Sequence, residues 1–279
     1  MARFPYSQVD VFTATALKGN PLGVVIGADS LTPEQMAAFA NWTNLSETTF
    51  LLNPTTDKAD YRVRIFTVAR ELPFAGHPTL GTCHVWLEAG GKPRGAEVVQ
   101  ECGAGLVRLR RDGKRLAFAA PPLKRSGAVE ADVLAQIARC LKVAPATIKA
   151  SNWVDNGPGF VAVLLASRTD VLALKPDFAA MENLRIGVVG PWQAADGSEA
   201  QFEVRAFVPG EGVKEDPVTG SLNAGVGQWM IAAGLAPARY VASQGTALGR
   251  AGRVYVEKIG DDVWVGGDSV TCIEGTVTL

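Results

Sequence analysis

The pattern of apolar and polar positions along the chain predicts many short strands. Runs rich in Val, Ile, Leu and Phe recur between stretches that contain Gly, Pro, Asn and Asp, which is typical of strands separated by turns. The first two expected strands flank a turn at Gly19-Asn20-Pro21. The expected strands are residues 9–13, 22–26, 47–52, 62–67, 97–100, 106–110, 116–118, 161–165, 185–189, 203–207, 254–258, 263–267 and 276–279.

Four helices are expected among these strands. The first follows Thr32, which can cap it, with Pro33 in the first turn and Gln35 closing a capping box. This helix should end near Trp42, and another is expected near residues 132–143.

The two remaining helices are apolar on most sides, and they belong to a segment that occurs twice. A strand, a tight corner and a helix at residues 63–90 are matched at residues 204–234, with a constant offset of 144 from Glu71 and Glu215 onward. Such helices suit the centre of a barrel or a curled sheet. The mixture of short strands with one helix per repeat predicts an α+β fold and not a Rossmann sheet.

Length and duplication together predict two pseudo-symmetric domains. A chain of 279 residues corresponds to about two domains, and residues 121–127 are the best linker candidate. We expect an N-terminal domain at residues 1–122 and a C-terminal domain at residues 128–279, and leave open whether the last strand returns to the first domain. Duplicated units usually lie about a pseudo-twofold axis, so chemistry is expected in the interdomain cleft.

The composition excludes several classes of partner. The chain is 47% hydrophobic and 20% charged, with a net charge of −1. No Lys/Arg cluster exceeds residues 108–111, so neither a nucleic acid nor a membrane surface is an expected partner. The longest apolar stretch, residues 160–166, is too short to span a bilayer, and the N-terminus lacks a signal-peptide core. A cytoplasmic location is the default expectation.

The four cysteines are scattered along the chain, without a CxxC pair or a nearby His at ligand spacing. This pattern favours reduced thiols over disulfides or a zinc site, and no metal is expected. The cysteines are Cys83, Cys102, Cys140 and Cys272.

The two repeated corners are the first candidate site. In each copy a Pro, two residues and a Gly (Gly76 or Gly220) lead into a helix N-terminus, where backbone N–H groups meet the positive end of the helix dipole. Two such ends facing each other would bind a carboxylate or a developing enolate. The alternative is that the glycines only permit a tight turn. The matched pair favours a site, because pockets between repeats tend to be functional.

His77 and Ser221 follow the corner glycines. His77 could hydrogen-bond a substrate or shuttle a proton, and Ser221 could hold a carboxylate. The alternative for both is a helix cap. A functional role is favoured for His77, because His is the usual proton carrier near neutral pH. His84, the other histidine, lies in an apolar helix and is expected to be a core residue.

Two acidic residues are also candidates. Asp216 stands where the first copy has Leu72, and an acid present in one copy only suggests a site, although it could also cap a turn beside Pro217. Glu47 begins a strand, and its spacing alone favours a solvent-facing position.

At these residues the chain resembles the PhzF family, which comprises the phenazine-biosynthesis isomerase and its relatives. The resemblance covers essentially the whole chain, and its motifs occur in order. They are Gly19-Asn20-Pro21-Leu22, Asn44-Leu45-Ser46-Glu47-Thr48-Thr49-Phe50, residues 70–81, residues 215–221, Gln244-Gly245 and residues 248–253.

The resemblance implies a diaminopimelate-epimerase-like fold, in which two similar domains each curl a sheet around a central helix. It also implies a cofactor-free isomerase that acts on a small molecule and usually forms a homodimer. The family's catalytic carboxylate corresponds to Glu47, and its supporting residues correspond to His77, Asp216 and Ser221. Asn20, in the first motif, is expected to bind substrate with Gly76, Gly220 and Ser221.

Two departures from the family and its fold relatives bear on the mechanism. Epimerases of this fold carry a cysteine just before each corner glycine, whereas this chain has Ala75 and Thr219. A two-thiol racemisation is therefore not available, and a single-base proton transfer by Glu47 is expected. Many relatives have Ala-His after the corner serine, and Leu222-Asn223 here leaves the substrate open.

The sequence thus predicts an isomerase that shifts a proton on a small, unsaturated, carboxylate-bearing substrate. A non-catalytic protein of the same fold that binds or senses a carboxylate is the alternative. A hydrolase acting through Ser221 is disfavoured, because the chain has no GxSxG elbow there.

Overall fold

The last strand of the chain, β18 (Ser269–Thr278), pairs antiparallel with the first, β1 (Arg3–Val11), in the computed structural model. The structure describes residues 2–193, 196–209 and 214–279. The chain divides into two units. Unit 1 contains the residues up to Ala119 together with Gly266–Leu279, and unit 2 contains Ala120–Val265.

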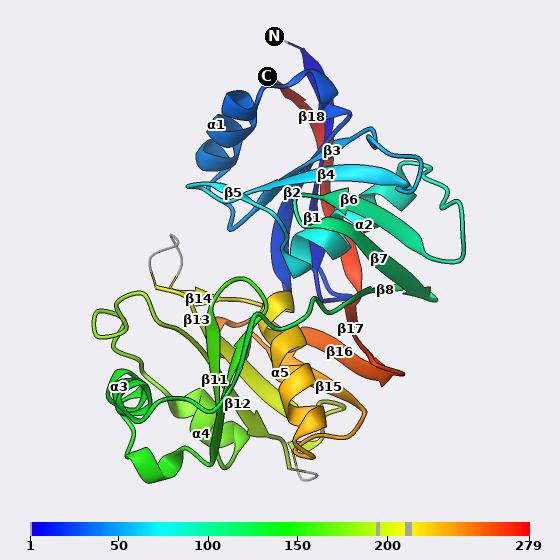
Figure 1. The fold of residues 1–279 in the computed structure, drawn as a ribbon. Helices are drawn as coiled ribbons and strands as arrows, with labels where there is room; N and C mark the ends of the chain where they lie inside the picture. Colours follow the sequence, from blue (N-terminus) through cyan, green and yellow to red (C-terminus); the bar gives the residue numbers. More distant parts are fainter. Residues whose placement is uncertain (1, 194–195, 210–213) are drawn as a thin grey trace. The chain divides into compact units, whose positions relative to one another are not determined.

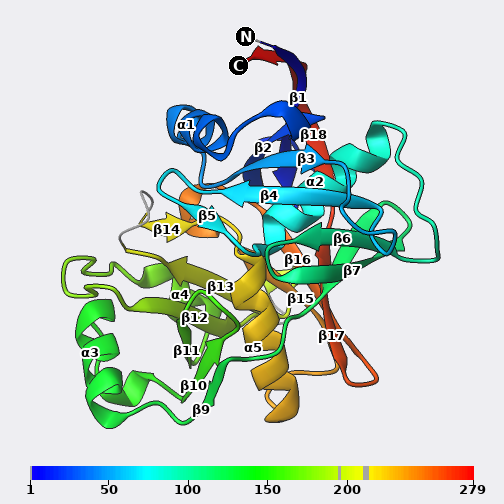
Figure 2. The ribbon, with the colours of Figure 1, turned by 45° about the horizontal axis from the view of Figure 1, so that its top comes forward.

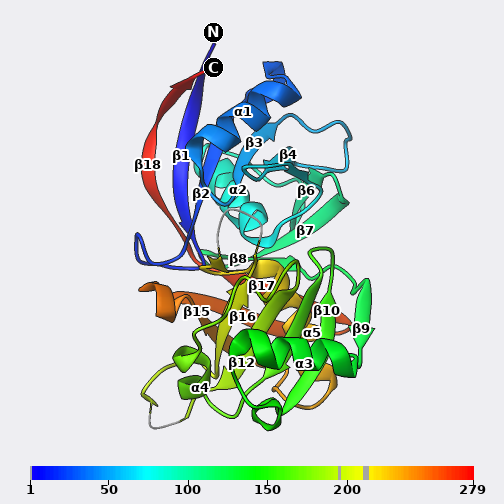
Figure 3. The same ribbon diagram turned by 90° about the vertical axis from the view of Figure 1, so that its left-hand side faces the viewer.

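Unit 1 is built on one curled sheet (Figures 1 and 3). Its strands follow the order β18–β1–β2–β3–β4–β6–β7–β8, with β5 paired to β4. Neighbours are antiparallel except β2–β3 and β4–β6, which are parallel. The remaining elements are β2 (Asn20–Ile26), η1 (Ala28–Ser30), α1 (Pro33–Thr43), β3 (Thr48–Leu52), β4 (Tyr61–Phe66), β5 (Glu71–Leu72), α2 (Gly76–Glu88), β6 (Val98–Cys102), β7 (Gly105–Asp112) and β8 (Arg115–Ala119).

Helix α2 lies within the curl of this sheet and contacts β1, β2, β3, β6 and β8. Most of its residues are buried, as its apolar sequence predicts. Gly81 permits the close approach, because a Cβ there would lie 2.6 Å from Cδ2 of Leu22. Helix α1 packs on β3 and β4, and Thr32 and Gln35 form the predicted capping box at its start.

Unit 2 repeats the same strand order. Its strands run β9–β10–β11–β12–β13–β15–β16, with β14 paired to β13, and the pairs β11–β12 and β13–β15 are parallel. Figure 2 shows α5 beside these strands, and α5 contacts β10 and β16. The elements are β9 (Arg125–Gly127), α3 (Ala131–Leu141), η2 (Pro145–Thr147), β10 (Ala150–Asp155), β11 (Phe160–Leu164), α4 (Arg168–Ala173), β12 (Arg185–Pro191), β13 (Phe202–Phe207), β14 (Glu215–Asp216), α5 (Gly220–Ala232), β15 (Arg239–Gln244), η4 (Thr246–Leu248), β16 (Gly252–Ile259) and β17 (Asp262–Gly267), whose last two residues are assigned to unit 1.

The duplication seen in the sequence extends to individual contacts. In unit 1 the guanidinium of Arg64 binds both carboxylate oxygens of Glu71, at 2.7 and 2.6 Å. In unit 2 Arg205 binds Glu215 in the same way, at 2.8 and 2.7 Å. Each fork ties a long strand to the short strand before the corner. Because the fork is present in both copies, we assign it a structural role.

The structure also corrects parts of the sequence-based expectation. Residues 121–127 are not all linker, because Arg125–Gly127 forms strand β9, which pairs with β10. Strands β10 and β15 and helix α4 were missed, because their sequences mix polar and small residues with few apolar ones. The predicted α+β class with two similar halves is confirmed.

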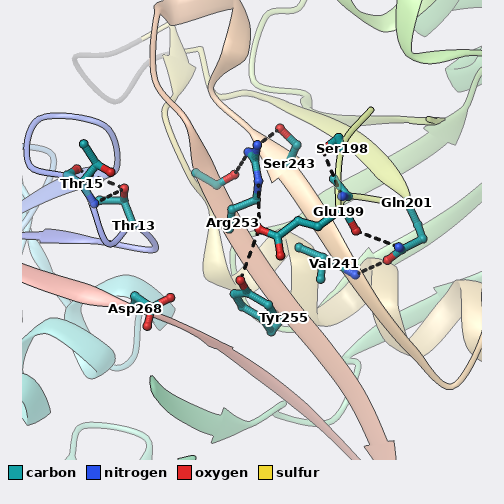
Figure 4. A network of polar contacts seen from close by, with 12 residues as sticks. Thr13, Thr15, Ser198, Glu199, Gln201, Val241, Ser243, Arg253, Tyr255 and Asp268 are labelled. Carbon is teal, nitrogen blue, oxygen red and sulfur yellow. Dashed lines mark hydrogen bonds and ion pairs between the residues drawn. The ribbon is translucent and has the colours of Figure 1, made fainter. Parts of the chain in front are cut away.

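Side chains around β15 and β16 form a polar network in unit 2 (Figure 4). Arg253 on β16 donates to Oγ of Ser243 at 3.1 Å and lies 3.6 Å from Glu199. Gln201 accepts a hydrogen bond from the backbone of Val241 at 2.7 Å. These contacts fasten β15 and β16 to the segment that precedes β13.

Three further findings concern the described residues alone. None of their helices is both long and apolar enough to cross a membrane, and they contain no group of three or more His, Cys, Asp or Glu side chains arranged to hold a metal ion. All four cysteines are free thiols, and Cys83 and Cys140 are buried.

Candidate active site

Asn20, Glu47 and His77 lie together in unit 1. Oε2 of Glu47 is 3.5 Å from Nε2 of His77, and Nδ2 of Asn20 is 3.3 Å from Nδ1 of the same ring. Two contacts compete for the ring proton, because the amide nitrogen of Asn20 can only donate to the ring, whereas the backbone of Pro21, which has no N–H, can only accept from it. Three of the residues singled out in the sequence therefore form one polar cluster.

Three elements bring this cluster together at one edge of the sheet. Asn20 is the first residue of β2, Glu47 immediately precedes β3, and His77 is the second residue of α2. Strands β2 and β3 are parallel neighbours, with Gly23 opposite Thr48. Their N-terminal ends therefore lie at the same edge. Glu47 is thus not the solvent-facing strand residue that its spacing alone favoured, since its side chain is only 17% exposed.

His77 is deeply buried, and its charge state follows from that burial. Loss of hydration lowers the pKa of His77 from 6.5 to about 3, although a hydrogen bond with the backbone of Pro21 opposes the shift. The ring is therefore neutral at neutral pH. A hydrogen-bonding role is favoured over that of a base, because a ring with so low a pKa does not take up a proton near neutral pH.

Asn20 is held in place from two sides. Oγ of Ser46 donates to its Oδ1 at 3.4 Å. The preceding turn is fixed because the backbone N–H of Gly19 donates to the buried carboxylate of Asp10 at 2.9 Å. A glycine is required in this turn, since a Cβ at position 19 would lie 2.2 Å from the carbonyl oxygen of Val11.

Asp216 belongs to a second cluster, in unit 2. Its Oδ2 accepts a hydrogen bond from Oγ1 of Thr219 at 2.6 Å. Its backbone carbonyl accepts one from Nε2 of Gln244 at 3.1 Å. The position of Leu72 in unit 1 has no such carboxylate, so the two corners differ in chemistry although their backbones correspond.

The N-terminal turns of α2 and α5 are not capped by side chains. The cap residues are Ala75 and Thr219, and neither accepts a hydrogen bond from its helix through its side chain. The idea that His77 and Ser221 are helix caps is therefore wrong. Both are the second residue of their helix, and the corner glycines are the first. Uncapped N–H groups and the helix dipole make each end suited to an anion.

The predicted site residues thus fall into two sets, one in each unit. Their joint action in one reaction stays a prediction. The first set is Asn20, Glu47, Gly76 and His77, and the second set is Asp216, Gly220 and Ser221. His84 is not part of either set: its Nε2 lies 2.9 Å from Oγ1 of Thr271 and 3.1 Å from Glu88.

Thr219 and Gln244 both touch Asp216, although the sequence pattern does not single them out as site residues. Gln244 is part of a motif shared with the family and carries no further local signal. The signal that could have identified it is the offset of 144, which aligns Gln244 with Gln100 and so places both on the strand that follows the helix. Nothing in the local sequence shows which way either amide points.

The chain is similar to several known proteins. A family model described as phenazine biosynthesis-like protein matches residues 9–275. The chain is 36% identical over 296 residues to antisense-enhancing sequence 1 of Schizosaccharomyces pombe, with 99% of each chain covered. It is 34% identical over 220 residues to trans-2,3-dihydro-3-hydroxyanthranilate isomerase of Pseudomonas fluorescens, which covers 77% of this chain and 76% of that protein. A solved PhzF family structure from Enterococcus faecalis has a TM-score of 0.83 at 24% identity, with all of both chains covered.

Proposed function

Since this chain belongs to the PhzF family of phenazine biosynthesis-like proteins and is an isomerase, we propose that it shifts a proton within a small unsaturated substrate that carries a carboxylate. The observation that carries the proposal is the carboxylate of Glu47 beside the neutral, buried ring of His77. A base held beside a neutral, hydrogen-bonding ring suits proton abstraction next to a conjugated system.

In this mechanism Glu47 is both base and acid. Its carboxylate takes a proton from an acidic C–H of the substrate, and the electron pair left on carbon spreads into the conjugated system. Glu47 then returns the proton to a different carbon. The double bond moves, and no electrons are gained or lost overall. The proposed reaction therefore needs no redox cofactor.

His77 supports this step without changing its charge. Nε2 of the ring lies 3.5 Å from the Glu47 carboxylate, which is longer than a normal hydrogen bond. The neutral ring can hydrogen-bond a polar group of the substrate near the reacting carbon. Asn20 contacts Nδ1 at 3.3 Å and so holds the ring beside Glu47.

We assign the substrate carboxylate to the helix ends. Gly76 and His77 present backbone N–H groups at the start of α2, and Gly220 and Ser221 do so at the start of α5. Asp216, as a hydrogen-bond acceptor beside the second end, would orient a donor group on the substrate. That both sets serve the same reaction is part of the proposal.

The test uses trans-2,3-dihydro-3-hydroxyanthranilate, the compound named for the Pseudomonas relative, as the first substrate. The unaltered protein in D₂O should isomerise it and incorporate deuterium, which NMR detects. Glu47→Gln should lose at least about 10³-fold in turnover, because an amide cannot take up the substrate proton as the proposed base does. The fold, checked by circular dichroism, should be unchanged.

Glu88→Gln is a matched control, since Glu88 also contacts a histidine but outside the cluster. It should keep the turnover of the unaltered protein. Deuterium incorporation by Glu47→Gln at the unaltered rate would eliminate Glu47 as the base. Tight binding of carboxylates without any exchange would instead favour the binding-protein alternative.

A further inference from the structure

Gln244 makes contacts in unit 2 that the proposed chemistry does not yet use. It is fully buried at the end of β15, and its amide makes four hydrogen bonds. Oε1 accepts from the backbone N–H of Thr219 at 3.1 Å and from Nδ2 of Asn223 at 2.8 Å. Nε2 donates to the carbonyl of Asp216 at 3.1 Å and to Oγ1 of Thr219 at 3.0 Å.

The backbone fixes the orientation of this amide. A backbone N–H can only donate, so the atom that faces Thr219 N must be the oxygen of Gln244. A backbone carbonyl can only accept, so the atom that faces Asp216 O must be the nitrogen. Two independent partners thus agree, and a flipped amide would create two repulsive contacts.

This orientation determines where the hydroxyl proton of Thr219 points. Oγ1 already accepts a hydrogen bond from Nε2 of Gln244, so its own proton is directed to Oδ2 of Asp216, 2.6 Å away. A chain of donors therefore runs from Gln244 through Thr219 to the Asp216 carboxylate. The same glutamine also holds the residue before the first turn of α5.

We infer that Gln244, acting through Thr219, is a positioning residue that fixes the carboxylate of Asp216 and the anion-binding end of α5 for the reaction. This inference rests on the role of Asp216 in the proposed function. Positioning matters because displacement of a reacting or orienting group by about 1 Å can cost about 10²-fold in rate.

Two substitutions of Thr219 separate this role from simple packing. Thr219→Val keeps the side-chain shape and removes the hydroxyl, whereas Thr219→Ser keeps the hydroxyl and removes a methyl group. If the hydroxyl positions Asp216, Thr219→Val should lower kcat about tenfold or more with little change in KM, and Thr219→Ser should stay within about threefold. The reverse order would show a packing role and overturn the inference.

Gln244→Met tests the glutamine itself, with Gln100→Met as the matched control. Gln100 occupies the corresponding place in unit 1. Its amide hydrogen-bonds the side chains of Thr79 and Tyr61, at 3.0 Å each, and not the residues of the corner before α2. Both variants lose buried hydrogen bonds. Only Gln244→Met should lower kcat about tenfold or more and accelerate hydrogen exchange at the Thr219 amide.

The closing experiment measures kcat for the dihydrohydroxyanthranilate assay and hydrogen exchange by NMR in all four variants and in Asp216→Asn. Unchanged exchange at Thr219 in Gln244→Met overturns the inference. So does full kcat in both Gln244→Met and Thr219→Val while Asp216→Asn is impaired, and in that case the proposed function stands. Full kcat in Asp216→Asn instead removes Asp216 from the proposed function, and the inference falls with it.

Discussion

The duplicated Arg–Glu forks allow a comparison of one ion pair in two environments. The pair Arg205–Glu215 is buried, with 7% and 8% of the side chains exposed. The pair Arg64–Glu71 has the same geometry, with 25% and 41% exposed. We expect Glu215→Gln to destabilise the protein far more than Glu71→Gln, because it leaves a buried guanidinium without its counter-charge.

The magnitude follows from that difference. Breaking a buried pair from one side costs about 3–5 kcal/mol, whereas an exposed pair contributes about 0–1 kcal/mol. Arg205 keeps its hydrogen bonds to the carbonyls of Val171 and Leu174, at 3.1 and 2.9 Å. Glutamine also keeps one acceptor oxygen. We therefore expect a loss near the lower end, about 3 kcal/mol, for Glu215→Gln.

Urea unfolding followed by circular dichroism measures both values, and the transitions are fitted separately if the two units unfold independently. The exposed pair should also weaken further in 0.5 M salt, whereas the buried pair should not. Equal losses for the two variants would refute the argument that burial, and not geometry, sets the value of the fork.

Two further predictions concern His77 and Gly81. With a pKa of about 3 for His77 in the folded state against 6.5 in the unfolded state, the unfolded chain binds more protons between these values, so stability should fall as the pH drops from 6.5 towards 3. The free energy of unfolding, measured at pH 7 and 5, should change by at most about 1.4 kcal/mol per pH unit because of this residue. The His77→Gln variant should lack this contribution, and an identical slope in that variant would contradict the assignment. Gly81→Ala should lower the free energy of unfolding by about 1–3 kcal/mol, because the new Cβ would lie 2.6 Å from Leu22. Gly95→Ala, with open space around it, is the control and should change that free energy little. Equal effects of the two substitutions would show that the helix can move away.

Local signals were sufficient for most of the fold. Short stretches of sequence predict the capping residues of α1 and the two apolar helices, and the structure confirms them. Strand β10 was missed because its sequence, Ala150–Asp155, contains Ser, Asn and Asp and lacks strict alternation. Its burial comes from pairing with β11 and from contact with α5, and neither is visible locally.

The candidate site was less predictable than the fold. His77 and Asp216 could be singled out because the two copies differ at these positions. No such difference between the two copies points to Glu47, and its spacing alone suggests an exposed strand residue. Only the meeting of three segments, 20–21, 46–47 and 76–77, places it beside a buried ring, and such long-range contacts cannot be read from periodicity.

The two corners also differ at one helix position, and the difference matches the orientation of each glutamine amide. In unit 1 the hydroxyl of Thr79 accepts from Nε2 of Gln100, so the nitrogen of that amide is directed to the helix. In unit 2 the same position is Asn223, whose Nδ2 donates to Oε1 of Gln244. The side-chain oxygen of Gln244 therefore faces the helix, and its nitrogen donates to the carbonyl of Asp216 and to Oγ1 of Thr219. The acceptor Thr79 in unit 1 is thus replaced by the donor Asn223 in unit 2. With this exchange, Gln244 contacts the corner that carries Asp216, whereas Gln100 does not contact its own corner.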